Sequence, residues 1–99
     1  MTKQNVSNQA LIALQEGRLE EAKHLYRSIL KEQPEHLDAN NNLGIILKND
    51  GRLDEAEARF KRAINIKPDF AEAYNNLGNT ISKLNKIDEA LICYKKAIE

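Results

Sequence analysis

The sequence predicts an all-α fold, a right-handed α-solenoid of three 34-residue helix-turn-helix repeats, with the third repeat truncated at its C-terminal end. Two observations predict it. The chain resembles itself when it is shifted by 34 residues, and each stretch of that length holds two amphipathic helical patterns separated by a turn residue. The repeats cover about 3–36, 37–70 and 71–99 and form one domain over residues 1–99.

The second and third repeats are similar enough to exclude chance. Residues 37–65 and 71–99 share 11 identities in 29 positions, where unrelated sequences would share roughly two. The segment Asn-Asn-Leu-Gly occurs at 41–44 and again at 75–78. One helix pair of this size cannot bury its own apolar face, so successive pairs are expected to stack.

The second repeat shows the predicted elements most clearly. Residues 37–50 form the first helix, with apolar residues at i, i+4, i+7 and i+8, and a second helix over 54–66 has Phe60 on its apolar face. Pro68 ends the pair, and Asp69 is expected to cap the next helix.

The turns and the close contacts fall on small residues. Gly17, Gly51 and Asn85 occupy the turn position of the three repeats, where a left-handed backbone is expected at the end of the first helix. Asparagine is the other residue that tolerates this conformation. Gly44 and Gly78 are expected to let a neighbouring helix approach closely.

These positions resemble the tetratricopeptide repeat, whose pattern is an aromatic, Leu-Gly, a hydrophobic residue, Ala, an aromatic, Ala and Pro. The third repeat matches at Tyr74, Leu77, Gly78, Ile81, Ala90, Tyr94 and Ala97. The second matches at Leu43, Gly44, Leu47, Ala56, Phe60, Ala63 and Pro68, with Asn40 in place of the first aromatic. The first keeps Ala22, Tyr26 and Pro34 but has Val6, Gln9 and Ala10 in place of aromatic-Leu-Gly. The repeat sequences, with their Asn-Asn-Leu-Gly segments, are most similar to the repeats of O-linked N-acetylglucosamine transferase-type domains.

The ends of the chain lead to a further expectation. A polar, divergent first repeat suits a terminal cap, because its outer face meets water, and together with Met1 it indicates a natural N-terminus. The third repeat ends at Glu99, which would leave Leu91 and Ile98 without a following repeat. The sequence is therefore expected to be the N-terminal fragment of a longer protein.

The resemblance implies a concave groove lined by the first helix of each pair. The sixth position of that helix is Asn8, Asn42 and Asn76. A primary amide both donates and accepts, so a row of amides can bind an extended peptide through its main chain. The row is similar to the asparagine ladder of the transferase-type repeats. Repeat duplication without any binding role also explains the row of asparagines, because Asn41 and Asn75 recur at the same interval.

The remaining groove candidates differ in charge. They are Asn41, Asn75, Asn79, Lys48, Lys83, Asp38 and Glu72. Tetratricopeptide domains that clamp the C-terminal carboxylate of a chaperone need several cations at matched groove positions. Asp38 and Glu72 occupy such places here, so binding of a chaperone tail is not expected.

Composition and motifs exclude other classes of function. Lys+Arg and Asp+Glu both number 15, so no basic surface for nucleic acid or membrane lipid is expected. A single cysteine, Cys93, permits no intrachain disulfide, and a cytoplasmic location is expected. His24, His36 and Cys93 lack metal-ligand spacing, and no nucleotide-binding or hydrolase motif occurs. No catalytic residue, metal or cofactor is therefore expected.

The leading hypothesis is a protein-protein interaction scaffold, not an enzyme, that binds an extended peptide of a partner in its groove. The resemblance implies in addition that a longer parent protein carries an enzyme domain, such as a transferase, to which the repeats recruit substrates. The alternative is a structural module that self-associates through its exposed repeat ends and has no peptide ligand.

Overall fold

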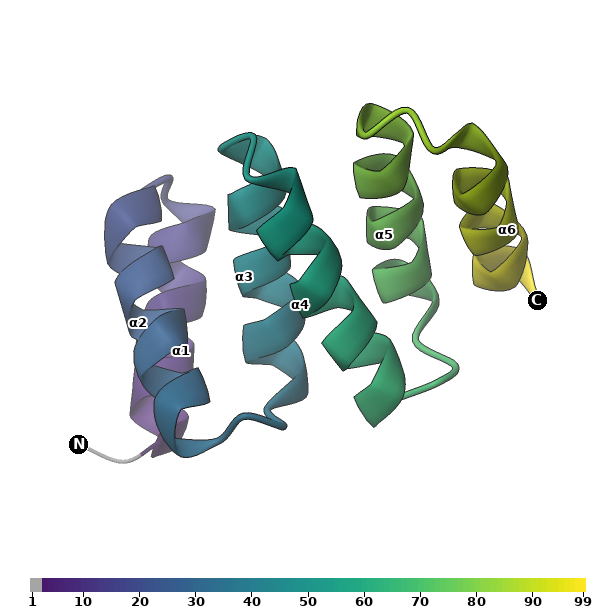
Figure 1. Ribbon diagram of the computed structural model, residues 1–99. Helices are drawn as coiled ribbons and strands as arrows, with labels where there is room; N and C mark the ends of the chain where they lie inside the picture. Colours follow the sequence, from purple (N-terminus) through teal and green to yellow (C-terminus); the bar gives the residue numbers. More distant parts are fainter. Residues whose placement is uncertain (1–2) are drawn as a thin grey trace.

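The chain folds into helices that stack as three antiparallel pairs. The computed structural model describes the backbone of residues 3–99 and the side chains of residues 5–99, so Met1, named above as a natural start, lies outside it. The helices are α1 (Lys3–Gln15), α2 (Leu19–Glu32), α3 (Leu37–Asn49), α4 (Leu53–Ile66), α5 (Ala71–Lys83) and α6 (Ile87–Ile98). In Figure 1 the pairs follow one another along a body of 43 × 25 × 20 Å. The predicted all-α repeat solenoid is confirmed.

Each pair closes through one residue in the left-handed region. The φ angles of Gly17, Gly51 and Asn85 are +78°, +83° and +64°, which confirms the turn prediction. In the second pair the N–H of Arg52 then donates to the carbonyl of Leu47 at 2.9 Å. The equivalent bond recurs in the other two pairs. These bonds satisfy carbonyls at the end of the first helix that would otherwise lack a partner.

The helix starts differ from the sequence prediction. Asp69 was expected to cap α5, but Phe70 is the N-cap residue and no side chain bonds the first turn there. Asp69 lies one residue too early, because the carbonyl of Phe70 accepts the first helical bonds of α5. A side-chain cap does occur at α3, where the Nδ1 of His36 accepts a hydrogen bond from the N–H of Ala39 at 3.0 Å.

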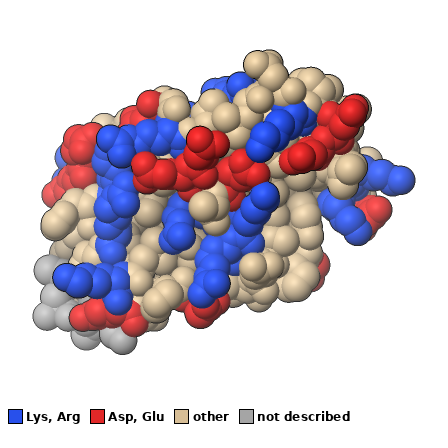
Figure 2. Space-filling view, in the orientation of Figure 1, with Lys and Arg blue, Asp and Glu red and all other residues tan. Residues whose placement is uncertain are grey.

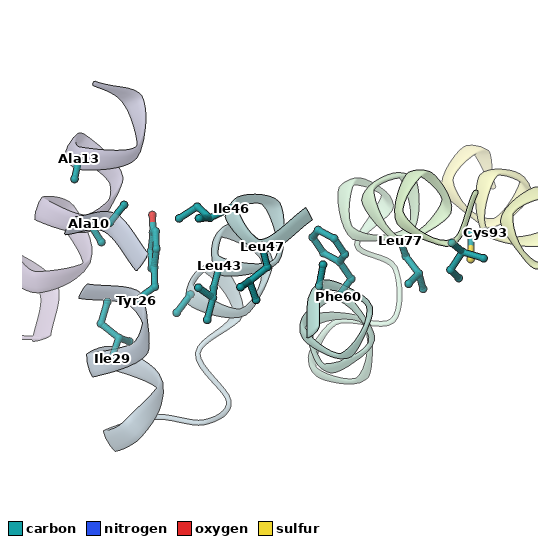
Figure 3. Packing of buried hydrophobic residues seen from close by; sticks show 14 of the residues in the cluster. Ala10, Ala13, Tyr26, Ile29, Leu43, Ile46, Leu47, Phe60, Leu77 and Cys93 are labelled. Carbon is teal, nitrogen blue, oxygen red and sulfur yellow. The ribbon is translucent and has the colours of Figure 1, made fainter. Parts of the chain in front are cut away.

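Within a pair, an aromatic ring lies directly on a glycine of the facing helix. A β-carbon at Gly44 would come within 2.6 Å of Phe60, and one at Gly78 within 2.8 Å of Tyr94. The predicted close approach at both glycines is therefore confirmed. Ala10 occupies the corresponding place in the first pair and is fully buried. Figure 3 follows the buried side chains from this first pair through Phe60 towards the third.

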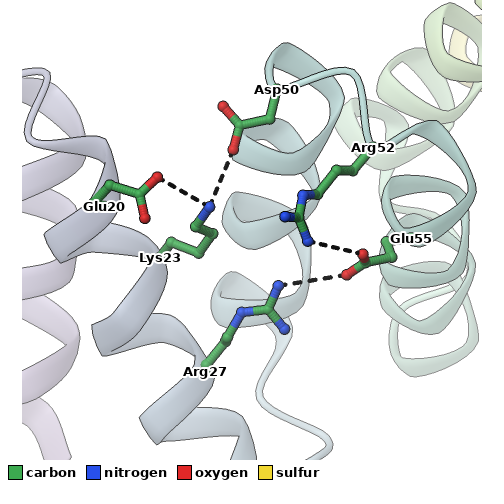
Figure 4. Close-up of polar contacts among 6 residues, drawn as sticks. All are labelled: Glu20, Lys23, Arg27, Asp50, Arg52 and Glu55. Carbon is green, nitrogen blue, oxygen red and sulfur yellow. Dashed lines mark hydrogen bonds and ion pairs between the residues drawn. The ribbon is translucent and has the colours of Figure 1, made fainter.

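Ion pairs join the first pair of helices to the second along their exposed side. Lys23 on α2 lies 3.2 Å from both Glu20 and Asp50, and Arg27 lies 3.4 Å from Glu55 on α4 (Figure 4). The hydrogen bond to Glu20, and after it the bond to Asp50, raises the pKa of Lys23 above its ordinary value. Exposed pairs of this kind contribute little stability one by one. They connect α2 to the end of α3 through Asp50 and to α4 through Glu55.

Replacing Gly44 with alanine is expected to destabilise the fold by about 1–3 kcal/mol, the usual cost of overpacking, because Phe60 is fully buried and cannot move aside. The higher helix propensity of alanine, worth up to about 1 kcal/mol, offsets only part of this. Gly78→Ala should cost less, since Tyr94 is partly exposed. Urea unfolding followed by circular dichroism measures both. Equal stability of Gly44→Ala and the wild type would contradict the expectation.

Candidate peptide-binding faces

One long face of the stack, called the inner face below, is formed by α1, α3 and α5. In Figure 1, α1 lies behind α2 and α3 lies behind α4, and α3 also contacts α5 directly. Asn8, Asn42 and Asn76 occupy the same position on these three helices. Asn8 is exposed, whereas Asn42 and Asn76 are half-buried.

The two half-buried amides are each held by one donated hydrogen bond. The Nδ2 of Asn42 donates to the hydroxyl of Tyr26 at 3.1 Å. Phe60 stands where Tyr26 would recur, and it has no hydroxyl, so Asn76 donates to Oδ1 of Asn41 at 3.3 Å instead. Within the described part of the chain, both amides keep an Oδ1 and one N–H without a partner. That is the pair of groups that a peptide unit requires.

Asn41 does not lie on the surface where the sequence placed it. Its side chain is only 2% exposed, because it packs between α3 and α5. The Nδ2 of Asn41 donates to Oε1 of Glu72 at 3.4 Å, and its Oδ1 accepts from Asn76. A buried amide needs such partners. Asn41 therefore joins two repeats and is not available to a ligand.

The other predicted groove residues divide by charge along the helices. Asp38 and Glu72 lie in the first turns of α3 and α5, and Lys48 and Lys83 lie in the last turns. Burial lowers the pKa of Lys48, and the nearby charge of Lys83 lowers it further. Among residues 5–99, no carboxylate pairs with either lysine. One edge of the inner face is thus acidic and the opposite edge basic.

Two further asparagines of α5 are exposed. Asn75 points away from the packed interior, and Asn79 accepts a hydrogen bond from the hydroxyl of Tyr94 on α6 at 2.5 Å. Asn79 is therefore partly engaged by its own helix pair. Of the predicted groove amides, Asn8, Asn42, Asn75 and Asn76 are the ones whose side chains reach solvent without a bond to α6.

A hollow of about 520 Å³ lies on the opposite side of the stack, between α2 and α4. The residues that line it are Arg27, Leu30, Lys31, Leu43, Leu47, Glu55, Ala58 and Arg59. Figure 2 shows this side of the molecule, with Lys and Arg spread over α2 and α4. Sequence reasoning missed this hollow, although the cations on the second helices of the first two repeats were a visible signal.

The family is decided by matches to one kind of repeat that together cover residues 13–99. A family model described as tetratricopeptide repeat matches residues 13–77, and a second with the same description matches residues 71–99. The chain belongs to the tetratricopeptide repeat family. No curated protein sequence matches it.

Solved structures share this tetratricopeptide fold. The structure "MamA AMB-1 P212121" is 25% identical to this chain, with a TM-score of 0.89. The match covers 97% of this chain and 52% of the MamA chain. "Crystal structure of MamA" is 23% identical with a TM-score of 0.90, covering 98% and 57%. "First TPR of Spaghetti (RPAP3) bound to HSP90 peptide SRMEEVD" is 18% identical with a TM-score of 0.91, covering 97% and 76%. The present chain spans about half the length of the MamA chains.

Asn40 fills the slot where the tetratricopeptide pattern has its first aromatic residue, and sequence reasoning gave it no role. It is fully buried. Its Nδ2 donates to the carbonyls of Pro34 and His36 at 3.0 and 2.9 Å, and its Oδ1 accepts from Arg59 at 3.0 Å. A polar residue in a slot expected to be buried was the available signal, since burial requires such bonds.

The described residues offer no group of three His, Cys, Asp or Glu side chains that could hold a metal ion. Cys93 is buried, and that burial, with Glu89 adding to it, raises the pKa of its thiol. A raised pKa lowers the thiolate fraction and with it the nucleophilicity of the sulfur. None of the described helices is long and apolar enough to cross a membrane.

Replacing Lys83 with glutamine is expected to raise the pKa of Lys48 part of the way to its ordinary value of 10.5, because one like charge is removed while burial remains. NMR titration of the lysine side chains measures this. Since the folded pKa of Lys48 lies below the unfolded one, stability rises with pH between the two values, and this rise should be smaller in the variant. An unchanged Lys48 pKa would show that the two charges do not interact.

Proposed function

We propose that this chain is a protein-interaction module that binds an extended segment of a partner protein along its inner face. The proposal rests on the hydrogen bonding of Asn42 and Asn76. Each donates one hydrogen bond within the stack and keeps an acceptor and a donor without a partner among the described residues. Asn8 continues the row at the exposed first helix.

Recognition by this row would depend on the main chain of the ligand. A peptide unit has one N–H and one C=O, and a primary amide complements both. Side-chain sequence would then matter little in the centre of the site. The acidic edge at Asp38 and Glu72 and the basic edge at Lys48 and Lys83 would favour ligands with positive and negative groups on matching sides.

The solved relatives bear on this proposal in a limited way. The RPAP3 domain is shown with an HSP90 peptide, and its likeness to the present chain is one of fold. Because Asp38 and Glu72 stand where a carboxylate clamp carries cations, we propose a ligand other than a chaperone tail. The row of amides also supports the resemblance to transferase-type repeats. In a longer parent protein, the module would recruit substrates to a downstream enzyme domain.

The triple variant Asn8→Ala, Asn42→Ala, Asn76→Ala tests the amide row. The probe is a fluorescein-labelled neutral peptide of alanine, serine and threonine, followed by anisotropy. Loss of three hydrogen bonds worth about 0.5–1.5 kcal/mol each should weaken binding at least about tenfold. The backbone N-methylated form of the peptide should bind as weakly to the wild-type protein.

Asn65→Ala on α4 is the matched control, since Asn65 is an exposed amide on the other side of the stack. It should bind the probe like the wild type. Circular dichroism checks that the triple variant keeps its helicity, because Asn76 also satisfies buried Asn41. Unchanged affinity of a folded triple variant for the neutral peptide would contradict the proposal.

A second candidate function is self-association through α6, and the exposure of its apolar residues favours it. Leu91 is 60% exposed and Ile98 is 87% exposed. In the second repeat, Glu57 and Ile64 hold the corresponding positions and are half-buried, because α5 packs against α4. A second copy of the chain that covered the α6 face would bury an apolar surface.

Leu91→Lys combined with Ile98→Lys is expected to abolish concentration-dependent association in sedimentation velocity runs, because charges would replace the apolar contact. Ile92→Lys is the matched control. Ile92 is also exposed, but its counterparts His24 and Ala58 are exposed in the other repeats and lie outside the stacking surface. A monomeric wild-type protein at all accessible concentrations would rule this candidate out.

A further inference from the structure

The hollow between α2 and α4, called the outer groove below, has an apolar floor that reaches the core. Leu43 and Leu47 of α3 are 2% and 1% exposed, and their buried side chains form its base. Leu30 and Ala58 form the walls from α2 and α4. Its volume of about 520 Å³ falls in the range of roughly 300–1,000 Å³ found for sites that hold ligand groups.

The rim of the outer groove carries an excess of positive charge. Arg59 donates to the neutral amide of Asn40, and it forms no ion pair with a carboxylate among the side chains of residues 5–99. Lys31 is exposed in the last turn of α2 and makes no ion pair with any described residue. Arg27 does pair with Glu55 at 3.4 Å, but Arg52 shares that carboxylate at 3.3 Å (Figure 4).

The positive surface continues across α2. A second hollow of about 270 Å³ is lined by His24, Arg27, Ser28 and Lys31. Arg27 and Lys31 line both hollows, so they stand between them. A bound segment could therefore leave the outer groove over these two cations and stay close to positive charge.

The next position along the stack shows that this combination is not a general property of the repeat. A shift of 34 residues replaces Lys31 with Asn65, Arg59 with Cys93 and Ala58 with Ile92. Two unneutralised cations are thereby lost, and a bulky side chain stands where the small one kept the first groove open. Lys61, which replaces Arg27, is paired with Glu57 at 2.8 Å.

We propose that the outer groove binds an acidic peptide segment of a partner protein, with one apolar side chain seated between α2 and α4 and flanking carboxylates on Lys31 and Arg59. Charge complementarity selects this occupant. Nucleic acid fits less well, because the first turns of α2 and α4 carry the carboxylates Glu20, Glu21, Asp54 and Glu55. In Figure 2 acidic side chains form a band across the upper part of this side, which would repel an extended polyanion.

The test uses a fluorescein-labelled peptide in which a single leucine is flanked on both sides by aspartates, with anisotropy as the readout. The wild-type chain should bind it more tightly than the same peptide with glycine in place of leucine. Lys31→Glu should weaken binding about five- to tenfold, since an attraction becomes a repulsion. Lys95→Glu is the matched control, because it makes the same charge change on exposed α6 and should leave the affinity unchanged.

Ala58→Ile narrows the groove at its α4 wall and so tests the apolar part of the site separately from the charge. Isoleucine already stands at the equivalent position 92, so the helix accepts it. This variant should bind the leucine and glycine peptides equally. The Asn8, Asn42, Asn76 triple variant should bind the acidic peptide like the wild type, which separates this site from the inner face.

Four results would overturn the proposal. The wild type could fail to bind the acidic peptide, or Lys95→Glu could weaken binding as much as Lys31→Glu. The leucine and glycine peptides could also bind the wild type equally, or a single-stranded oligonucleotide could bind as tightly as the leucine peptide. That last pair of outcomes would indicate a charge-only contact with polyanions.

Discussion

The ring of Phe60 rests on the backbone of α3 at Gly44, where any β-carbon would come within 2.6 Å of it. This contact sets how closely α4 approaches α3. It therefore sets the position of Ala58 and Arg59 on α4 and the width of the outer groove. In a solenoid each pair touches only its neighbours, so no distant contact corrects an error in one pair. Both surfaces of the molecule depend on this spacing.

The elements of the fold could be predicted because the 34-residue period places the same packing demand on the same slot in every repeat. Gly17, Gly51 and Asn85 illustrate this, since each has the left-handed backbone that the turn requires. The start of α5 could not be predicted in the same way. Whether Asp69 or Phe70 is the N-cap depends on a register of one residue, and the repeat pattern does not resolve that.

The candidate sites could be predicted only in part. The period places Asn8, Asn42 and Asn76 at equivalent helix positions, but it does not give their hydrogen-bond partners. Asn41 is buried because it meets Glu72 and Asn76 of the following repeat. The outer groove could not be read from any one helix, because its walls come from α2 and α4 and its floor from α3. Side-chain length decides whether such a gap stays open.

The orientation of an amide on the inner face is set by the preceding repeat. Asn42 is held by the hydroxyl of Tyr26, 16 residues earlier, whereas Asn76 follows Phe60 and bonds to another amide instead. The repeats of this chain therefore cannot be exchanged without changing these hydrogen bonds. If recombination or protein engineering moved the third repeat behind a tyrosine-bearing neighbour, its own sequence would be intact. Its amide would nevertheless bond to a different partner, so repeat order carries information that no single repeat contains.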